Sequence, residues 1–349
     1  MTADLRHAAS MLDASARALA VRAVEHQLDD DADAVATLGF ASELLGDTEL
    51  RIHHLAAAVR VGCEELMFDQ VDWLKVAMVA RDLDWSHLDG NFRALAKTIA
   101  EQLPPDVVEF PVRFLERSRE RLQTASTEIP SLLETDGPLI DVARRYLLAV
   151  LETRADDAVS LVLDRLRGGE APETLLRDVL VLVQRELGRM WQMDEIHVAE
   201  EHYGSRVAER VMAAMHEIAR RAPAVGKRLV TAAAGGELHE LGLRTVSYHF
   251  EWAGWSTVLL GANMPIPDLI RAIFDFEPDL LALASSTPLQ LDSTWQAIEA
   301  VRQYSDVPIL VGGAPFTRLP RLAGIIGADA SATDGPAAVA AGNRLVGLG

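Results

Sequence analysis

Cysteine is nearly absent from this sequence, because Cys63 is the only one among 349 residues. One thiol cannot form an intramolecular disulfide or a cysteine-based metal site. The chain also lacks any apolar run of about 18 residues that would cross a bilayer, and its first residues lack the basic start and apolar stretch of a secretory leader. We therefore expect a cytoplasmic protein that is neither exported nor inserted in a membrane.

Positive charge is scarce, with 33 Lys and Arg against 52 Asp and Glu and a formal charge of −19. Such a chain repels polyphosphate, so direct nucleic-acid binding is not expected. Aromatic residues make up only 5%, whereas 49% hydrophobic and 24% charged residues are an ordinary globular balance. The length allows two or three domains.

The first predicted domain, residues 1–130, is all-helical. Its apolar residues recur at steps of three and four, and proline is absent before Pro104. An acidic run at 29–31 predicts one helix end, and Pro104 another break. Residues 46–49, Gly-Asp-Thr-Glu, predict a helix stop followed by the cap and acidic first turn of a new helix over 47–61.

A second domain, residues 138–222, is predicted as a four-helix bundle. The polar, proline-containing stretch 125–138 separates it from the first domain. Its four helical patterns cover 140–151, 155–166, 172–190 and 194–221.

The third domain, residues 223–349, changes period and alternates short apolar runs with amphipathic helices. This alternation predicts a doubly wound, flavodoxin-like sheet of five parallel strands with helices on both faces. Ligands bind outside the carboxyl ends of such strands. The predicted strands are 228–234, 257–260, 280–285, 309–311 and 328–330, and the predicted helices are 240–253, 266–274, 289–303, 317–325 and 336–345.

Three loops at that edge carry the candidate chemistry. The first loop contains Glu237 and His239 before a glycine, the third contains Ser285 and Thr287, and the fourth contains a double glycine at 312–313. A lone loop histidine is usually an ordinary exposed residue. Small residues at successive crossings, however, allow a bulky group to approach the backbone closely, and hydroxyls can bond its polar atoms.

These loops resemble the cobalamin-binding domain of methionine synthase, the mutases and the light-sensing regulators. The family pattern Asp-x-His-x-x-Gly, Ser-x-Thr or Ser-x-Leu, and Gly-Gly is matched here with Glu237 in place of Asp. The resemblance implies that His239 displaces the cofactor's own base and ligates cobalt from below, while Glu237 receives its other N–H. The implied cofactor-binding residues of this domain are Glu237, Leu238, Gly242, Ser285, Thr287, Gly312 and Gly313.

A pattern in the predicted bundle resembles one subgroup of these cobalamin-binding proteins. Trp191 precedes Glu201 and His202 in a Trp-x9-Glu-His pattern similar to the cap of adenosylcobalamin photoreceptors related to the carotenoid-pathway repressor. Away from a cobalamin-binding domain, a tryptophan at a helix end is usually a core residue, and a Glu-His pair on a helix usually belongs to a solvent-exposed face. The resemblance implies that all three contact the adenosyl group. Gln192 stands where those photoreceptors have a second cobalt-binding histidine, so after illumination we expect water, His197 or His202 as the upper ligand.

The helical first domain does not resemble the DNA-binding domain of those repressors. A helical domain before such a cap resembles the photocobilins, which hold biliverdin beside cobalamin. The resemblance implies a bilin, and noncovalent binding is favoured over a thioether to Cys63. The bilin-site candidates are Arg51, His53, His54 and Trp73, each of which is otherwise a packed or solvated helix residue.

Three functions follow from these patterns. The favoured one is a non-enzymatic light sensor that binds adenosylcobalamin and biliverdin, changes its homo-oligomeric state on cobalt–carbon photolysis, and signals through a protein partner. The alternative is a corrinoid carrier protein for a methyltransferase. An adenosylcobalamin mutase is excluded, since its barrel of about 250 residues has no room beside the bundle and the sheet.

Overall fold

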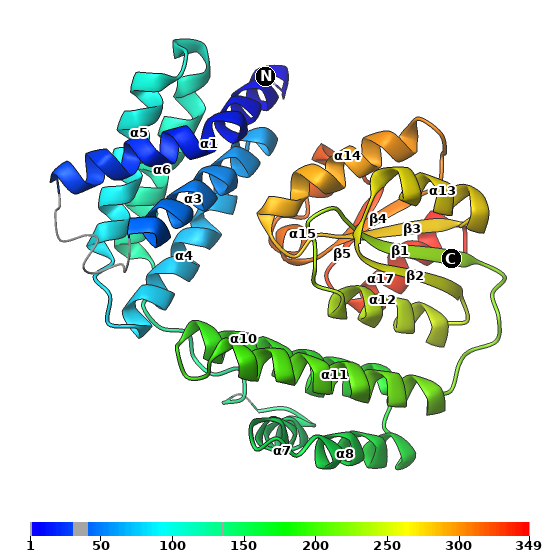
Figure 1. The fold of residues 1–349 in the computed structure, drawn as a ribbon. Coiled ribbons are helices and arrows are strands. Elements are labelled where there is room, and N and C mark those ends of the chain that lie inside the picture. Colours follow the sequence, from blue (N-terminus) through cyan, green and yellow to red (C-terminus); the bar gives the residue numbers. More distant parts are fainter. Residues whose placement is uncertain (1, 31–40, 135, 349) are drawn as a thin grey trace. The chain divides into compact units, whose positions relative to one another are not determined.

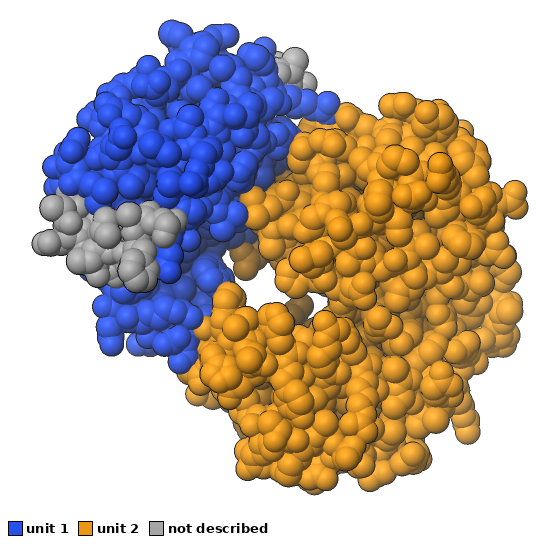
Figure 2. Space-filling model, viewed as in Figure 1, with its two compact units in different colours: residues 1–129, 192–194 blue, residues 130–191, 195–349 orange. Residues whose placement is uncertain are grey.

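The computed structural model describes residues 2–30, 41–134 and 136–348. The chain divides into two compact units, coloured separately in Figure 2. Unit 1 contains residues 1–129 together with 192–194, and unit 2 contains 130–191 and 195–349. Within the described ranges, no helix is both long and apolar enough to cross a membrane.

Unit 1 is helical, as predicted (Figure 1). Its core is formed by aliphatic and aromatic side chains, among them Leu12, Leu55 and Phe92. Pro105 begins a helix, where its missing N–H costs nothing. The helices are α1 (Thr2–Asp30), α3 (Ala41–Val61), α4 (Glu65–Ala80), α5 (Ser86–Gln102) and α6 (Pro105–Thr124).

One predicted boundary in unit 1 is wrong. Helix α3 begins at Ala41 and runs through Gly46 without a break. Thr48 does not cap a new helix; its hydroxyl is buried and donates to the carbonyl of Leu44 at 2.7 Å. Packing of Leu44 in the core outweighs the intrinsic cost of a glycine inside a helix, which is about 1 kcal/mol.

The helical part of unit 2 packs around Tyr146, Val179 and Leu187. The third predicted helix is continuous over 172–192 but contains a π-helical segment, Leu176–Val181. Such wider turns occur frequently at functional sites. The helices are α7 (Ile140–Leu151), α8 (Ala155–Arg167), α9 (Pro172–Leu175), the π-helical segment, α10 (Leu182–Gln192) and α11 (Val198–Ile218).

The rest of unit 2 is a parallel sheet in the order β2-β1-β3-β4-β5, which confirms the flavodoxin-like prediction. Helices α12 and α17 pack together on one face, and α13 and α14 on the other (Figure 1). The strands are β1 (Arg228–Ala234), β2 (Ser256–Met264), β3 (Leu280–Ala284), β4 (Ile309–Gly312) and β5 (Ala330–Ala332), and the longer helices are α12 (Leu241–Trp252), α13 (Ile266–Phe276), α14 (Leu291–Arg302) and α17 (Gly335–Leu345).

Two predicted elements of this region differ from the structure. The helix expected over 317–325 is two short helices, α15 (Ala314–Arg318) and α16 (Leu322–Ile325), since Pro320 cannot continue a helix. The weak last strand lies two residues later than predicted. Its pairing with Leu310, Val311 and Gly312 of β4 sets that register, which a three-residue apolar pattern does not determine.

Candidate functional site

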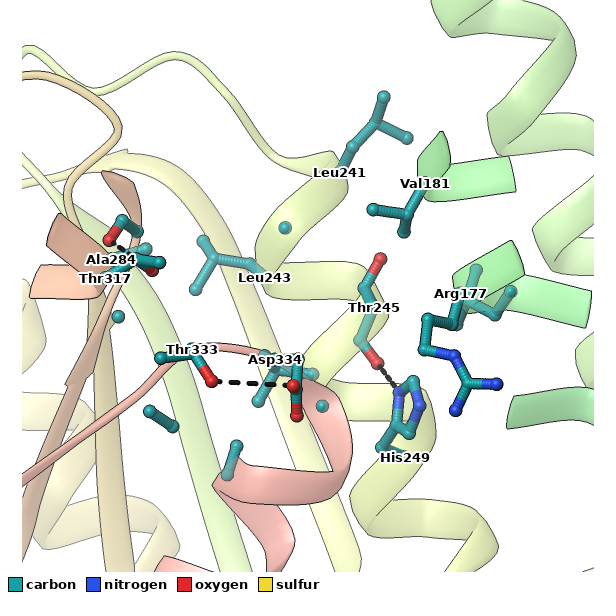
Figure 3. A pocket seen from close by; sticks show the side chains of 18 of the residues that line it. Arg177, Val181, Leu241, Leu243, Thr245, His249, Ala284, Thr317, Thr333 and Asp334 are labelled. Atoms are coloured by element: carbon teal, nitrogen blue, oxygen red, sulfur yellow. Dashed lines mark hydrogen bonds between the residues drawn. The ribbon is translucent and has the colours of Figure 1, made fainter. Parts of the chain in front are cut away.

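A cavity of about 1150 Å³ opens at the carboxyl edge of the sheet, where the bundle helices face it. Figure 3 shows Thr245 and His249 on the side of α12 toward Val181 and Arg177 of the bundle, and Leu243 on the side toward the strands. The volume exceeds the ~300–1,000 Å³ of common small-ligand sites. The cavity therefore suits a large ligand with one face on the sheet and another on the bundle.

His239 lies on the wall of this cavity, in the loop between β1 and α12. Its side chain is 72% exposed, whereas that of Glu237 is fully buried. The Nδ1 atom of His239 lies 2.6 Å from Oε1 of Glu237, which also accepts the His239 backbone N–H at 2.9 Å. The second carboxylate oxygen accepts the N–H of Ser286. With Nδ1 engaged, Nε2 is left available for a metal.

The charges of this pair reinforce each other. The hydrogen bond that the imidazole donates to Glu237 is the main cause that raises the pKa of His239, and the Glu201 carboxylate on α11 raises it further. Burial pushes the pKa of Glu237 upward, but its hydrogen bonds with His239 and Ser286 outweigh burial and lower the pKa overall. Glu237 is thus an ionised acceptor that makes the imidazole a more basic ligand. Glu237 therefore accepts the hydrogen bond from the imidazole that the motif predicts.

Within the described ranges, no three His, Cys, Asp or Glu side chains gather into a metal-binding group. Two imidazoles line the cavity, but His249 is buried and His239 is exposed, so His239 is the one open to a metal. A single open imidazole suits an ion whose equatorial ligands come from a macrocycle. The open position of Nε2 and the large cavity beside it fit a corrinoid.

The double glycine forms a tight crossing beneath the cavity. Both Gly312 and Gly313 line it. Gly313 has φ +111°, and a Cβ there would overlap the carbonyl of Ser285. This position therefore requires glycine for its backbone conformation and for its contact with the β3 loop.

The hydroxyls of the β3 loop are arranged differently from the expectation. Ser285 is fully buried and its hydroxyl bonds Thr294 at 2.7 Å, while the Thr287 hydroxyl donates to Gln290 at 2.6 Å. Neither residue lines the cavity, but Ser286 does. Ser285 and Thr287 therefore hold the shape of the loop, and Ser286 is its residue at the cavity. Gly242 lines the cavity as expected, whereas Leu238 is exposed and does not line it.

On the bundle, Glu201 belongs to a stripe on α11. The spacing of Glu201, Ser205, Ala208 and Met212 places them on one helix face, and the last two line the cavity. The Ser205 hydroxyl lies 3.0 Å from a Glu201 carboxylate oxygen and 3.1 Å from the amide oxygen of Gln184, another lining residue. Gln184 and Ser205 were not among the residues expected from the sequence, and their only signal there is their helical spacing.

Trp191, Glu201 and His202 themselves are outside the cavity lining. Trp191 is half-buried against the core of the bundle, and His202 is exposed with its Nδ1 atom 2.9 Å from Glu201. Gln192 belongs to unit 1, where its amide donates to the carbonyl of Trp73 at 3.1 Å. Its amide is therefore engaged in a backbone contact.

The candidates in the first domain make ordinary packing contacts. Arg51 is buried and donates to Asn91 at 3.1 Å, and burial lowers its pKa. His53 pairs with Asp13 at 2.8 Å, and His54 bonds the carbonyl of Leu50 one turn earlier. Trp73 is partly exposed, and Cys63 is buried.

Two regions of the chain match known domain models. Residues 227–341 match a B12 binding domain, and residues 142–215 match a second model that is also described as a B12 binding domain. Together with the exposed His239 at the carboxyl edge of the sheet, these matches make the chain a cobalamin-binding protein.

Among curated proteins, the HTH-type transcriptional repressor CarH of Myxococcus xanthus is 28% identical over 180 residues, which cover 51% of this chain and 59% of the repressor. Dimethylamine corrinoid protein 1 of Methanosarcina acetivorans is 22% identical over 205 residues, which cover 57% of this chain and 95% of that protein. Among solved structures, the monomethylamine corrinoid protein of Methanosarcina barkeri matches with a TM-score of 0.51 and 17% identity, over 59% of this chain and 99% of that one. The last match shows the fold alone.

Proposed function

We propose that the protein is a light sensor that binds adenosylcobalamin, with His239 as the lower cobalt ligand. The observation that carries this proposal is the α11 stripe, in which Ser205 supports the Glu201 carboxylate on the same helix face as Ala208 and Met212, the two residues of the stripe that line the cavity. A carboxylate suits the hydroxyls of a nucleoside, whereas a methyl group offers it nothing to bind. The similarity to the CarH repressor and the Trp-x9-Glu-His pattern support the same reading.

When bound, adenosylcobalamin would supply a cobalt–carbon bond that visible light cleaves, and Glu201 and Trp191 would be the residues that hold its adenosyl group. On this proposal, Glu201 then loses the hydroxyls that it accepts from, and Trp191 loses its contact. The two residues lie on α10 and α11, so these helices become free to repack. A changed cap surface favours a different homo-oligomer or partner protein.

The test starts from apo protein loaded with adenosylcobalamin in the dark. Absorption spectra and light-scattering masses are recorded before and after illumination. We expect protein-bound photolysis accompanied by a change in oligomer size. Trp191→Ala and Glu201→Gln should weaken adenosylcobalamin binding without weakening methylcobalamin binding. Photolysis no different from that of the free cofactor, with no change in mass, would refute the sensor.

The proposed ligand His239 has its own test. Cobalt(II) forms of the cofactor show nitrogen splitting in electron paramagnetic resonance, and labelling the protein with ¹⁵N-histidine changes that splitting only if a histidine is bound. We expect the label to change the spectrum of wild type and to leave that of His239→Ala unchanged. Identical spectra from labelled and unlabelled wild type would exclude histidine ligation.

A corrinoid carrier for methyl transfer is the second candidate. It is favoured by the match over nearly the whole of the dimethylamine corrinoid protein. On this reading, methylcobalamin binds more tightly than adenosylcobalamin and illumination leaves the oligomer unchanged. The same titrations therefore separate the two functions.

Biliverdin binding stays a prediction for the first domain. Because Cys63 is buried, a noncovalent complex is expected. Protein produced with a biliverdin source should show far-red absorption that is lost on denaturation. Colourless protein under those conditions would remove the bilin from the proposal without affecting the cobalamin site.

A further inference from the structure

Strand β2 is irregular where it passes the loop that carries His239. In its pairing with β1, Thr231 lies opposite Leu259, Ala232 opposite Gly261, and Ala234 opposite Met264. Each step leaves one extra residue on β2, so the end of this strand contains two successive bulges. Bulges redirect a strand locally and are common next to functional sites.

Two residues of the bulged segment have left-handed backbone conformations, Gly261 at φ +84° and Asn263 at φ +52°. Asparagine is among the few residues other than glycine that adopt this conformation readily. At Asn263 this backbone conformation lets the side chain and the backbone N–H both bond the loop that precedes His239. The Oδ1 atom accepts the N–H of Gly236 at 2.9 Å, and the Asn263 N–H donates to the carbonyl of Glu237 at 2.9 Å.

A third hydrogen bond joins β2 to the loop on the other side of His239. The N–H of Ala262 donates to the side chain of Glu240 at 3.1 Å. The bulged end of β2 therefore holds the loop at positions 236, 237 and 240, on both sides of His239. Within this span Leu238 and His239 are mostly exposed, so side-chain packing contributes little to placing the imidazole.

We propose that Asn263 is a positioning residue for His239. Gly236 has φ +87°, and nothing lies within 4 Å of where its Cβ would be, so side-chain packing does not hold the start of the loop and backbone hydrogen bonds must do so. The hydrogen bond that the Gly236 N–H donates to Asn263 restricts the backbone at this position. It sets the backbone of Glu237, whose carboxylate orients the imidazole. This inference rests on the proposed role of His239 as the cobalt ligand.

Three substitutions separate the parts of this arrangement. Asn263→Asp keeps an oxygen acceptor and tolerates the left-handed backbone. Asn263→Gly keeps the backbone conformation and removes only the acceptor, while Asn263→Ala removes the acceptor and strains the backbone. Asn343→Ala is the matched control, because Asn343 also accepts one hydrogen bond in this domain, from Trp255 Nε1 at 3.0 Å.

Adenosylcobalamin is titrated in the dark, and histidine nitrogen splitting is measured with the cobalt(II) cofactor. Losing a residue that orients a metal ligand costs about 10–100-fold in affinity. We expect about tenfold weaker binding and a reduced histidine-bound fraction for Asn263→Gly, a larger loss for Asn263→Ala, and values within about threefold of wild type for Asn263→Asp and Asn343→Ala. In the apo protein, hydrogen exchange of the 235–240 loop should rise for the glycine and alanine variants only.

The outcomes distinguish this inference from the function on which it rests. If His239→Ala retains the histidine splitting of wild type, His239 is not the ligand and the inference fails with it. If His239→Ala loses the splitting but Asn263→Gly matches wild type in affinity and loop exchange, only the role of Asn263 is overturned. Binding by Asn263→Asp as weak as that of Asn263→Ala would also overturn it, because the acceptor is retained.

Discussion

Replacing Glu237 by glutamine tests the electrostatics of the site most directly. The carboxylate accepts three hydrogen bonds, two from His239 and one from the Ser286 backbone. A glutamine side chain has one oxygen and one NH₂ group, so an N–H must face another N–H at one of these contacts. The negative charge that makes His239 more basic is lost as well.

The expected loss is about 10–100-fold in cobalamin affinity, or ~1.4–2.7 kcal/mol. This range agrees with the ~1.5–3 kcal/mol of one hydrogen bond to a charged group. Binding is measured by absorption titration in the dark at pH 8. Glu209→Gln is the control, because Glu209 pairs with Arg206 on the bundle surface. A Glu237→Gln variant that binds within twofold of wild type would refute the reasoning.

The same variant has a predicted pH profile. Cobalt binds the neutral imidazole, so the affinity of wild type falls as the pH drops through the raised pKa of His239. Without the carboxylate that pKa is lower, and the decline in affinity moves to lower pH. Titrations repeated between about pH 5 and 8 check the direction. A decline at the same pH in both proteins would show that Glu237 does not set the charge of His239.

Three further outcomes follow from individual contacts. Gly313→Ala should destabilise the apo protein by ~2–4 kcal/mol in urea unfolding, because its Cβ meets backbone at positive φ, whereas Gly312→Ala should cost less than ~1 kcal/mol; equal costs would contradict the close crossing. Ser205→Ala should weaken adenosylcobalamin binding ~3–10-fold, the effect of losing one hydrogen bond, and leave methylcobalamin binding unchanged, because the Glu201 carboxylate loses the hydroxyl that supports it. Burial lowers the pKa of His249, so the unfolded chain binds the proton first and stability should fall as the pH drops below about 6.5; a His249→Leu variant should lose part of this pH dependence, and an unchanged slope would contradict it.

Helices and strands could be predicted from the sequence where the local hydrophobic pattern and the tertiary packing favour the same limits. Strand β1 is buried over almost its whole length and its limits match the apolar run in the sequence. Pattern and packing disagree at Gly46, where burial of Leu44 keeps α3 continuous. They disagree again at β2, which is longer than its apolar run because pairing with β1 extends through the bulges at Gly261 and Asn263.

The motif residues of the candidate site could be predicted from the sequence, whereas the other residues around the cavity could not. His239, Gly312 and Gly313 line the cavity as their loop positions indicated. Ser285 does not, because its hydroxyl finds Thr294 on α14, a partner that lies nine residues away and is set by packing. The sequence does not show which of the adjacent residues Ser285 and Ser286 is buried in the core and which lines the cavity.

Sequence alone determined the class of fold, the loop that presents an imidazole and the helical pattern of the bundle, because periodicity and turn residues act locally. Tertiary structure decided how that imidazole is held. The carboxylate of Glu237 reaches Ser286 on another loop, and Asn263 reaches Gly236 only through the bulged end of β2. Hydrogen bonds between strands depend on register, and register is settled when the whole sheet packs.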